Sequence, residues 1–179
     1  DKDNSVLKDI DGVLFDKNGD KLIAYPNMRA ANYDIPEGTV EIGAASFFMC
    51  NKIKIINFPS TLKKIGMLAF GHCIKMHEVT VPDNITDLGD FSFYNCTSLE
   101  KATIKANITE LKRYMFSRCT ALKNVVLPST IEAIQTWAFG SCAAIKNIKL
   151  PDNLKAIEAE AFNGCETLNE ITLPASLEQ

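Results

Sequence analysis

The sequence lacks most of the motifs from which enzymes build active sites. Only two histidines and one tryptophan occur in 179 residues, and there is no G-x-S-x-G motif, phosphate-binding glycine loop or C-x2-C pair. Its apolar runs are only a few residues long, whereas a membrane-spanning helix needs about 20. The net charge of −3 leaves no strongly basic stripe of the kind that nucleic-acid binders carry. These absences argue against an enzyme, a cofactor or metal site, membrane insertion of this segment and a nucleic-acid interface.

What the sequence does contain is a repeat. Its six cysteines are each 23 residues apart, and a phenylalanine stands three residues before every one of them. A fixed period of this size is typical of a solenoid, in which each unit packs only on its neighbours. With 46% hydrophobic residues, the chain has enough apolar material for one continuous core. The pairs are Phe47 and Cys50, Phe70 and Cys73, Phe93 and Cys96, Phe116 and Cys119, Phe139 and Cys142, and Phe162 and Cys165.

The even number of cysteines could indicate disulfides, but the spacing favours free thiols. Stacked units place each cysteine about 4.8 Å from the next, one strand spacing away. Their parallel Cα–Cβ bonds then leave the Cβ atoms at about the same distance, which is beyond the usual ~3.5–4.5 Å of a disulfide. Free cysteine behaves as a small buried hydrophobe. We therefore expect a ladder of buried thiols.

Each unit carries apolar residues at fixed distances after its cysteine. Residues six and eight positions on, such as Val79 and Val81, have strand periodicity, and a proline such as Pro82 follows in most units. Short runs of good helix formers, such as residues 158–162, come before the next cysteine. The pattern predicts an α/β solenoid with a parallel sheet on its concave face and short helical turns on the convex side.

The first 34 residues do not keep the repeat, and we expect them to form a capping segment before an array over residues 35–179. Asn18-Gly19 lies between two apolar runs, which predicts a β-hairpin. Asp16, Asn18 and Asp20 also resemble the start of a calcium loop, but Lys21 stands where its glycine belongs and Asn27 where its glutamate belongs. A plain turn is the better interpretation.

The pattern C-x2-L-x2-I-x-L-P-x2-L-x2-I-G-x3-A-F-x2-C resembles the BspA-like leucine-rich repeat, and it covers the chain from Ile35 to Leu177. The resemblance implies a secreted or cell-surface protein without enzymatic activity, involved in adhesion or macromolecular ligand recognition. A structural spacer that presents another domain of a longer surface protein is the alternative. We expect a monomer without cofactors.

Two features depart from the regular repeat. Between Cys96 and Cys119, proline becomes Lys105, glycine becomes Lys112, and alanine before the phenylalanine becomes Met115. Ala102 in that unit is small, and we expect methionine to fill the volume it leaves, since methionine adapts to irregular gaps. The chain opens without an initiator methionine and its last unit stops at Gln179, so we expect a processed form whose natural sequence continues at the C-terminus.

The outward positions of the predicted sheet are the best candidates for ligand binding. They carry five lysines against three glutamates, so the sheet face is more basic than the whole chain and favours an acidic partner. An ordinary solvated sheet face is the simpler interpretation, and the absence of aromatic residues there weakens a case for stacking on sugars or bases. The candidate residues are Lys54, His77, Glu78, Glu100, Lys101, Lys123, Asn124, Lys146, Asn147, Lys149 and Glu170.

Overall fold

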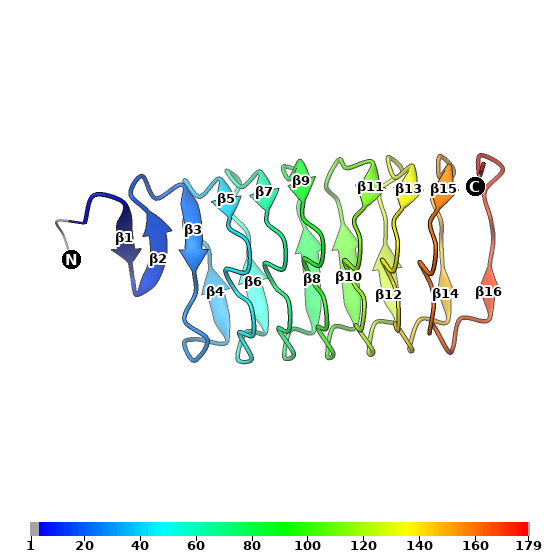
Figure 1. Ribbon diagram of the computed structural model, residues 1–179, viewed down its shortest axis with the longest axis horizontal. Helices are drawn as coiled ribbons and strands as arrows, with labels where there is room; N and C mark the ends of the chain where they lie inside the picture. The colour runs from blue at the N-terminus through cyan, green and yellow to red at the C-terminus, as the bar shows by residue number, and fades with distance from the viewer. Residues whose placement is uncertain (1–3, 179) are drawn as a thin grey trace.

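The computed structural model describes residues 4–178, in which antiparallel strands at the N-terminus lead into a solenoid of parallel strands in a single row of rungs (Figure 1). Each rung contributes one strand of three or four residues, or a shorter one near the C-terminus, to a first side of the solenoid, which we call the strand face. Its strands are β4 (Asn32–Asp34), β6 (Ile55–Asn57), β8 (Glu78–Val81), β10 (Lys101–Ile104), β12 (Asn124–Val126), β14 (Asn147–Ile148) and β16 (Glu170–Ile171).

A second side, the short-strand face, is made mostly of two-residue strands. They are β3 (Lys21–Ala24), β5 (Glu41–Ile42), β7 (Lys64–Ile65), β9 (Asp87–Leu88), β11 (Glu110–Leu111), β13 (Ala133–Ile134) and β15 (Ala156–Ile157). On both sides the pairing is parallel and keeps the sequence period, so that Ala102 lies opposite Val79 and Val125. The unit with Lys105 and Lys112 keeps this register on the strand face, but the ladder of short strands is interrupted there, between β9 and β11.

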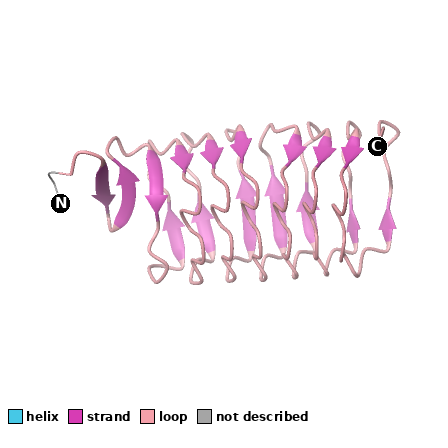
Figure 2. Ribbon diagram, viewed as in Figure 1, coloured by secondary structure: helices cyan, strands magenta, loops and turns pink. Residues whose placement is uncertain are grey.

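The third side of each rung, which we call the turn edge, corrects the prediction of short helical turns. No helix occurs in residues 4–178 (Figure 2). Instead, two residues four positions apart in each turn adopt positive φ, for example Leu68 (φ 56) and His72 (φ 60). A residue at positive φ cannot continue a right-handed helix. The turn edge comprises residues 43–49, 66–72, 89–95, 112–118, 135–141 and 158–164.

Hydrogen bonds between rungs replace the missing helical ones. The backbone N–H groups of Leu68, Phe70 and His72 donate to carbonyls of the following rung at 3.0, 2.8 and 2.7 Å. Backbone hydrogen bonds between rungs therefore occur on all three sides of the solenoid, although the pairing on the strand face is interrupted between β6 and β8 and between β12 and β14. The concave sheet face was predicted opposite short helical turns, and no such turns occur in residues 4–178.

The first strands close the N-terminal end of the stack. The predicted hairpin is present as β2 (Val13–Asp16) and β3, which pair antiparallel, and Asp16 Oδ1 accepts hydrogen bonds from the N–H groups of Gly19 and Lys21 at 2.8 and 3.0 Å. This carboxylate therefore shapes a plain turn. An unpredicted strand, β1 (Leu7–Ile10), adds a second hairpin to β2 through Asp11 and Gly12, both at positive φ.

The capping segment merges with the array. β3 pairs in parallel with β5, and β4 pairs in parallel with β6. The division of the chain at residue 34 stays a prediction. The parallel backbone pairing that joins successive rungs already begins within the capping segment, at β3 and β4.

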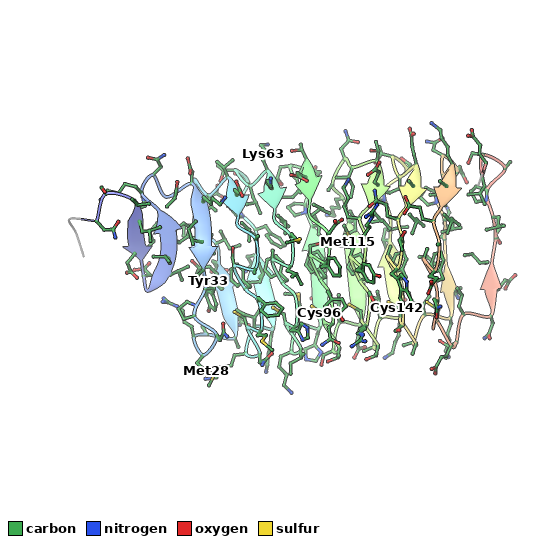
Figure 3. The ribbon with its side chains drawn as sticks, in the orientation of Figure 1. Met28, Tyr33, Lys63, Cys96, Met115 and Cys142 are labelled. Atoms are coloured by element: carbon green, nitrogen blue, oxygen red, sulfur yellow. The ribbon has the colours of Figure 1, made fainter. Side chains whose placement is uncertain are left out.

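The predicted spine of phenylalanine and cysteine is the core of the protein. Successive phenylalanine rings from Phe47 to Phe162 stack with centroids 4.9–5.7 Å apart and planes within 21° of parallel. All six cysteines are free, and those before Cys165 are buried. Figure 3 shows Cys96 and Cys142 at matching places along the stack. Ala102 and Met115 are both fully buried. That Met115 fills the volume left by the small Ala102 side chain stays a prediction.

Burial weakens in the last rung. Phe162, Cys165 and Leu168 are only partly buried, whereas their equivalents Phe139, Cys142 and Ile145 are 0% exposed. The eighth position after the cysteine was expected in the core, but Leu173 is 55% exposed there. A rung side chain is covered by the rungs on both sides of it, and residues 4–178 include no rung beyond this one.

Candidate functional site

The cysteine ladder is a structural element rather than a reactive one. Each thiol from Cys73 to Cys165 donates to the carbonyl of a phenylalanine on the preceding rung, with Sγ–O distances of 3.1–3.2 Å. The carbonyls of Phe47, Phe70, Phe116 and Phe139 also accept the backbone N–H of the cysteine in their own rung, as Phe70 does from Cys73 at 3.2 Å. Burial raises the pKa of the Cys50 thiol to about 12 and that of Cys119 well above its usual value. A protonated, enclosed thiol is a poor nucleophile.

A metal site is equally unsupported in the described part of the chain. Residues 4–178 hold no group of three or more His, Cys, Asp or Glu side chains placed to share an ion. The same residues contain no helix that is long and apolar enough to cross a membrane.

The outward residues of the strand face stand in columns along the solenoid. The register aligns Glu78, Lys101 and Asn124 on β8, β10 and β12, and Asn147 with Glu170 on β14 and β16. All eleven predicted binding residues are exposed. The strands thus arrange these side chains in columns on one side of the solenoid, within the three sheets β4–β6, β8–β10–β12 and β14–β16.

Nine of the eleven predicted residues line two open depressions. The first, with a volume of ≈ 560 Å³, lies over β6 to β12 and is lined by Lys54, Ile55, His77, Glu78, Glu100, Lys101 and Asn124. The second, of ≈ 500 Å³, lies over β14 and β16 and is lined by Asn147, Ile148, Lys149, Leu150, Asp152, Glu170, Thr172 and Pro174. Lys123 and Lys146 line neither depression.

Positive charge on this face is greatest toward its C-terminal half. Lys123 Nζ forms an ion pair with Glu100 Oε2 at 3.2 Å, with both side chains more than half exposed. Four of the five strand-face lysines, Lys54, Lys101, Lys146 and Lys149, have no carboxylate within ion-pair distance among the described residues. Of these, Lys146 and Lys149 lie together in the C-terminal half of the face.

Sequence reasoning missed Asp152 and the apolar contribution to this face. Asp152 follows the proline at the corner of its rung, one residue beyond the predicted strand, and lines the depression over β14 and β16. Ile55 and Val126 are 45% and 52% exposed on the strand face. Their outward position could be read from the strand alternation, but the candidate list favoured polar residues.

The turn edge holds a second group of side chains that sequence reasoning left out. Phe91, Tyr114 and Trp137 occupy the same place in three successive rungs, with centroids 4.6 and 6.0 Å apart and planes within 5° of parallel. They are partly exposed. The signal that could have found them is the aromatic residue five positions before three successive cysteines.

Comparison with known proteins gives a consistent result. A family model described as "BspA type Leucine rich repeat region" matches residues 23–146 and 133–179 with six copies. No curated protein matches. A leucine-rich repeat protein from Eubacterium ventriosum is 25% identical with a TM-score of 0.83, over 99% of this chain and 54% of its own. The chain thus spans about half the length of that relative.

Two further solved structures are similar. The leucine-rich repeat protein of T. pallidum is 26% identical with a TM-score of 0.81, over 87% of this chain and 75% of its own. A leucine-rich cell surface protein from Faecalibacterium prausnitzii is 29% identical with a TM-score of 0.65, over 94% of this chain and 40% of its own.

Proposed function

Because the chain belongs to the BspA-type leucine-rich repeat family, we propose that it is a recognition protein of the cell surface or the extracellular space, without enzymatic activity. The repeat family and its fold are generally non-enzymatic, and leucine-rich repeat proteins generally bind proteins. The description of the F. prausnitzii relative as a cell surface protein supports the location. The protein acts as a monomer on a protein or other macromolecular ligand.

One observation carries the choice of surface. The strand face presents the columns of exposed polar side chains, and Lys146 and Lys149 stand on it without an acidic partner among the described residues. Such a face attracts an acidic partner by long-range steering and gains charge-assisted contacts when the partner arrives. The ligand therefore lies across β12, β14 and β16 and presents carboxylates.

Charge reversal on the strand face tests this proposal. The double variant Lys146→Glu/Lys149→Glu should weaken binding to acidic extracellular proteins by about tenfold or more, because two attractive contacts become repulsive. Binding is measured by biolayer interferometry against a panel of purified acidic extracellular proteins. Raising the salt concentration should weaken wild-type binding in the same direction.

Lys63→Glu is the matched control. This exposed lysine has no ion pair among the described residues, and it directly precedes β7 on the short-strand face, at the upper edge of Figure 3. Its reversal changes the net charge without touching the strand face. If the strand-face variant and the control bind every panel member as wild type does, the strand face is not the binding surface.

A spacer role is the second candidate, because the chain covers only 54% and 40% of two of the solved relatives. Backbone hydrogen bonds join successive rungs on three sides of the solenoid and stiffen it, so that it could hold another domain at a distance. Small-angle X-ray scattering of a longer form tests this role. A rod of constant cross-section that gains length with each added repeat supports the spacer, and a flexible chain of separate bodies argues against it.

A further inference from the structure

The turn edge carries an unbroken row of ring contacts that the strand face lacks. Neighbouring rings lie with centroids 4.6–6.0 Å apart from the first rung with a phenylalanine–cysteine pair to the fifth. We call this row the aromatic edge, and its members in order are Phe48, His72, Tyr94, Phe91, Tyr114 and Trp137.

The core does not require these rings. They are partly exposed, unlike the phenylalanine stack beneath them, and Met49 and Met67 beside them are 46% and 51% exposed. The turn position of Phe91, Tyr114 and Trp137 is filled by Ala45 and Glu160 in other rungs with the same positive φ. Since the fold accepts small or charged side chains there, the aromatic residues are not explained by folding alone.

The rings are held in place before any partner arrives. Phe91 and Tyr114 stack at 4.6 Å with planes 3° apart. A Cβ on Gly140 would overlap the Trp137 indole, so this glycine leaves the space in which the ring lies. Rigid aromatic side chains lose little entropy on binding, and Trp, Tyr and Arg dominate the binding energy of protein interfaces.

Mutual stacking also limits what the edge can bind. The facing surfaces of Phe91 and Tyr114 cover one another, as do those of Tyr114 and Trp137, so these ring faces are closed to a ligand. A sugar ring would need an open aromatic face, whereas apolar side chains of a polypeptide pack well against ring edges.

Two of the three arginines lie in the rung of Tyr114. The Arg118 guanidinium lies 5.9 Å from the centroid of the Tyr94 ring. Neither Arg113 nor Arg118 forms an ion pair with another described residue. Arginine binds carboxylates with paired hydrogen bonds, so the middle of the aromatic edge is complementary to an acidic group.

The spacing of the rungs selects the conformation of the partner. Same-side residues of an extended strand repeat at about 6.6 Å, whereas those of a polyproline II helix repeat at about 9.3 Å, three residues of about 3.1 Å. Two rungs of the solenoid span about 9.6 Å. We propose that the aromatic edge binds an acidic, proline-rich segment of a partner protein in the polyproline II conformation, with its apolar side chains over alternate rungs and a carboxylate at Arg113 and Arg118.

The chain contains its own probe, because Trp137 is the only tryptophan. A tryptophan-free synthetic peptide with the repeat Pro-Pro-Leu-Pro-Pro-Asp should change the Trp137 emission in a saturable way. The variant Arg113→Glu/Arg118→Glu should bind this peptide about tenfold or more weakly, the effect of losing charge-assisted contacts. Lys146→Glu/Lys149→Glu should bind it as wild type does, which separates this edge from the strand face.

Two matched peptides sharpen the test. Replacing Asp by Lys should abolish the emission change, and replacing the prolines by Gly and Ser should weaken it about tenfold or more, because the flexible chain must be ordered on binding. The proposal is overturned by no saturable change with the acidic peptide, by equal binding of the Gly/Ser peptide, or by unchanged binding in the arginine variant with a wild-type circular dichroism spectrum. A saturable response to an oligosaccharide in place of the peptide would assign the edge to glycans and overturn it as well.

Discussion

The interior rungs and the last rung carry the same motif in different surroundings. Phe93 and Cys96 have a rung on each side and are 0% exposed, whereas Phe162 and Cys165 are only partly buried. At the opposite end, the rings of Tyr25 and Tyr33 lie 4.9 and 6.1 Å from the Phe47 ring, and the Cys50 thiol donates to the Tyr25 carbonyl at 3.6 Å. Phe47 and Cys50 are 0% exposed there. The difference shows that a repeat residue draws its stability from neighbouring rungs more than from its own.

Truncating a core ring should give the largest contrast between the two regions. Phe93→Ala removes a fully buried ring from the middle of the stack and should lower the free energy of unfolding by about 3–5 kcal/mol. Phe162→Ala removes a ring that contacts only Phe139 in the stack and should lower it by about 1–2 kcal/mol, since less apolar area is lost. Equilibrium urea unfolding followed by circular dichroism measures both, and equal losses would contradict the comparison.

Alkaline pH should reveal the same contrast through the thiols. Burial raises the pKa of Cys50 to about 12, while a thiol in the unfolded chain ionises near its usual value of 9.0. The unfolded chain therefore releases protons first, and stability that is fully present below about pH 9 falls as pH rises toward 12. Each buried thiol contributes a slope of about 1.4 kcal/mol per pH unit.

Cysteine variants separate the contributions to that slope. Cys119→Ala should reduce the slope of the free energy of unfolding against pH above pH 9 by nearly the contribution of one thiol. The reason is that Cys119 is 0% exposed and its pKa is raised well above the usual value. Cys165→Ala should reduce the slope less, since partial burial raises the pKa of this thiol by a smaller amount. Urea midpoints measured from pH 7 to pH 11 test the order, and the reverse order would count against the burial argument.

Thiol labelling should show a smaller but more selective difference. In the native protein at pH 8, Cys165 should react first with Ellman's reagent, because it is the only cysteine that is not fully buried. The other thiols should react only as the chain opens. We expect one faster phase of labelling, which should be absent from Cys165→Ala and unchanged in Cys119→Ala. If several thiols of the wild-type protein react together, the interior rungs are open to solvent.

The smallest effect concerns backbone strain on the turn edge. Ala45→Gly should raise the free energy of unfolding by about 0.5–1 kcal/mol, since alanine at φ 55 is strained and its side chain is exposed. Glu160→Gly in the last rung should raise the free energy of unfolding by less, because it also removes the hydrogen bond that Glu160 accepts from the Asn163 amide at 3.0 Å. Ala44→Gly is the matched control, as Ala44 is exposed without positive φ, and a gain in that variant as well would rule out relief of strain.

Much of the strand face was predictable from residue alternation. The positions of Lys101 and Glu78 follow from period two within a strand, because neighbouring residues point to opposite sides. The depression lined by Asp152 was not predictable, since it lies at a corner where the chain leaves the strand. The exposure of Leu173 was missed because its repeat position predicts burial, which a neighbouring rung would have to supply.

The amino-acid sequence by itself determines the period, the stack of Phe and Cys, and the hairpin at Asn18-Gly19, because each is written in local spacing or in a turn residue. Tertiary structure alone decides the turn edge. Residues such as Leu68 and Phe91 carry no turn signal, yet they adopt positive φ because their N–H groups donate at 3.0 and 2.9 Å to carbonyls of the next rung. Those acceptors exist only once the rungs have stacked, so the backbone conformation, and with it the aromatic edge, comes from the assembly of the whole chain.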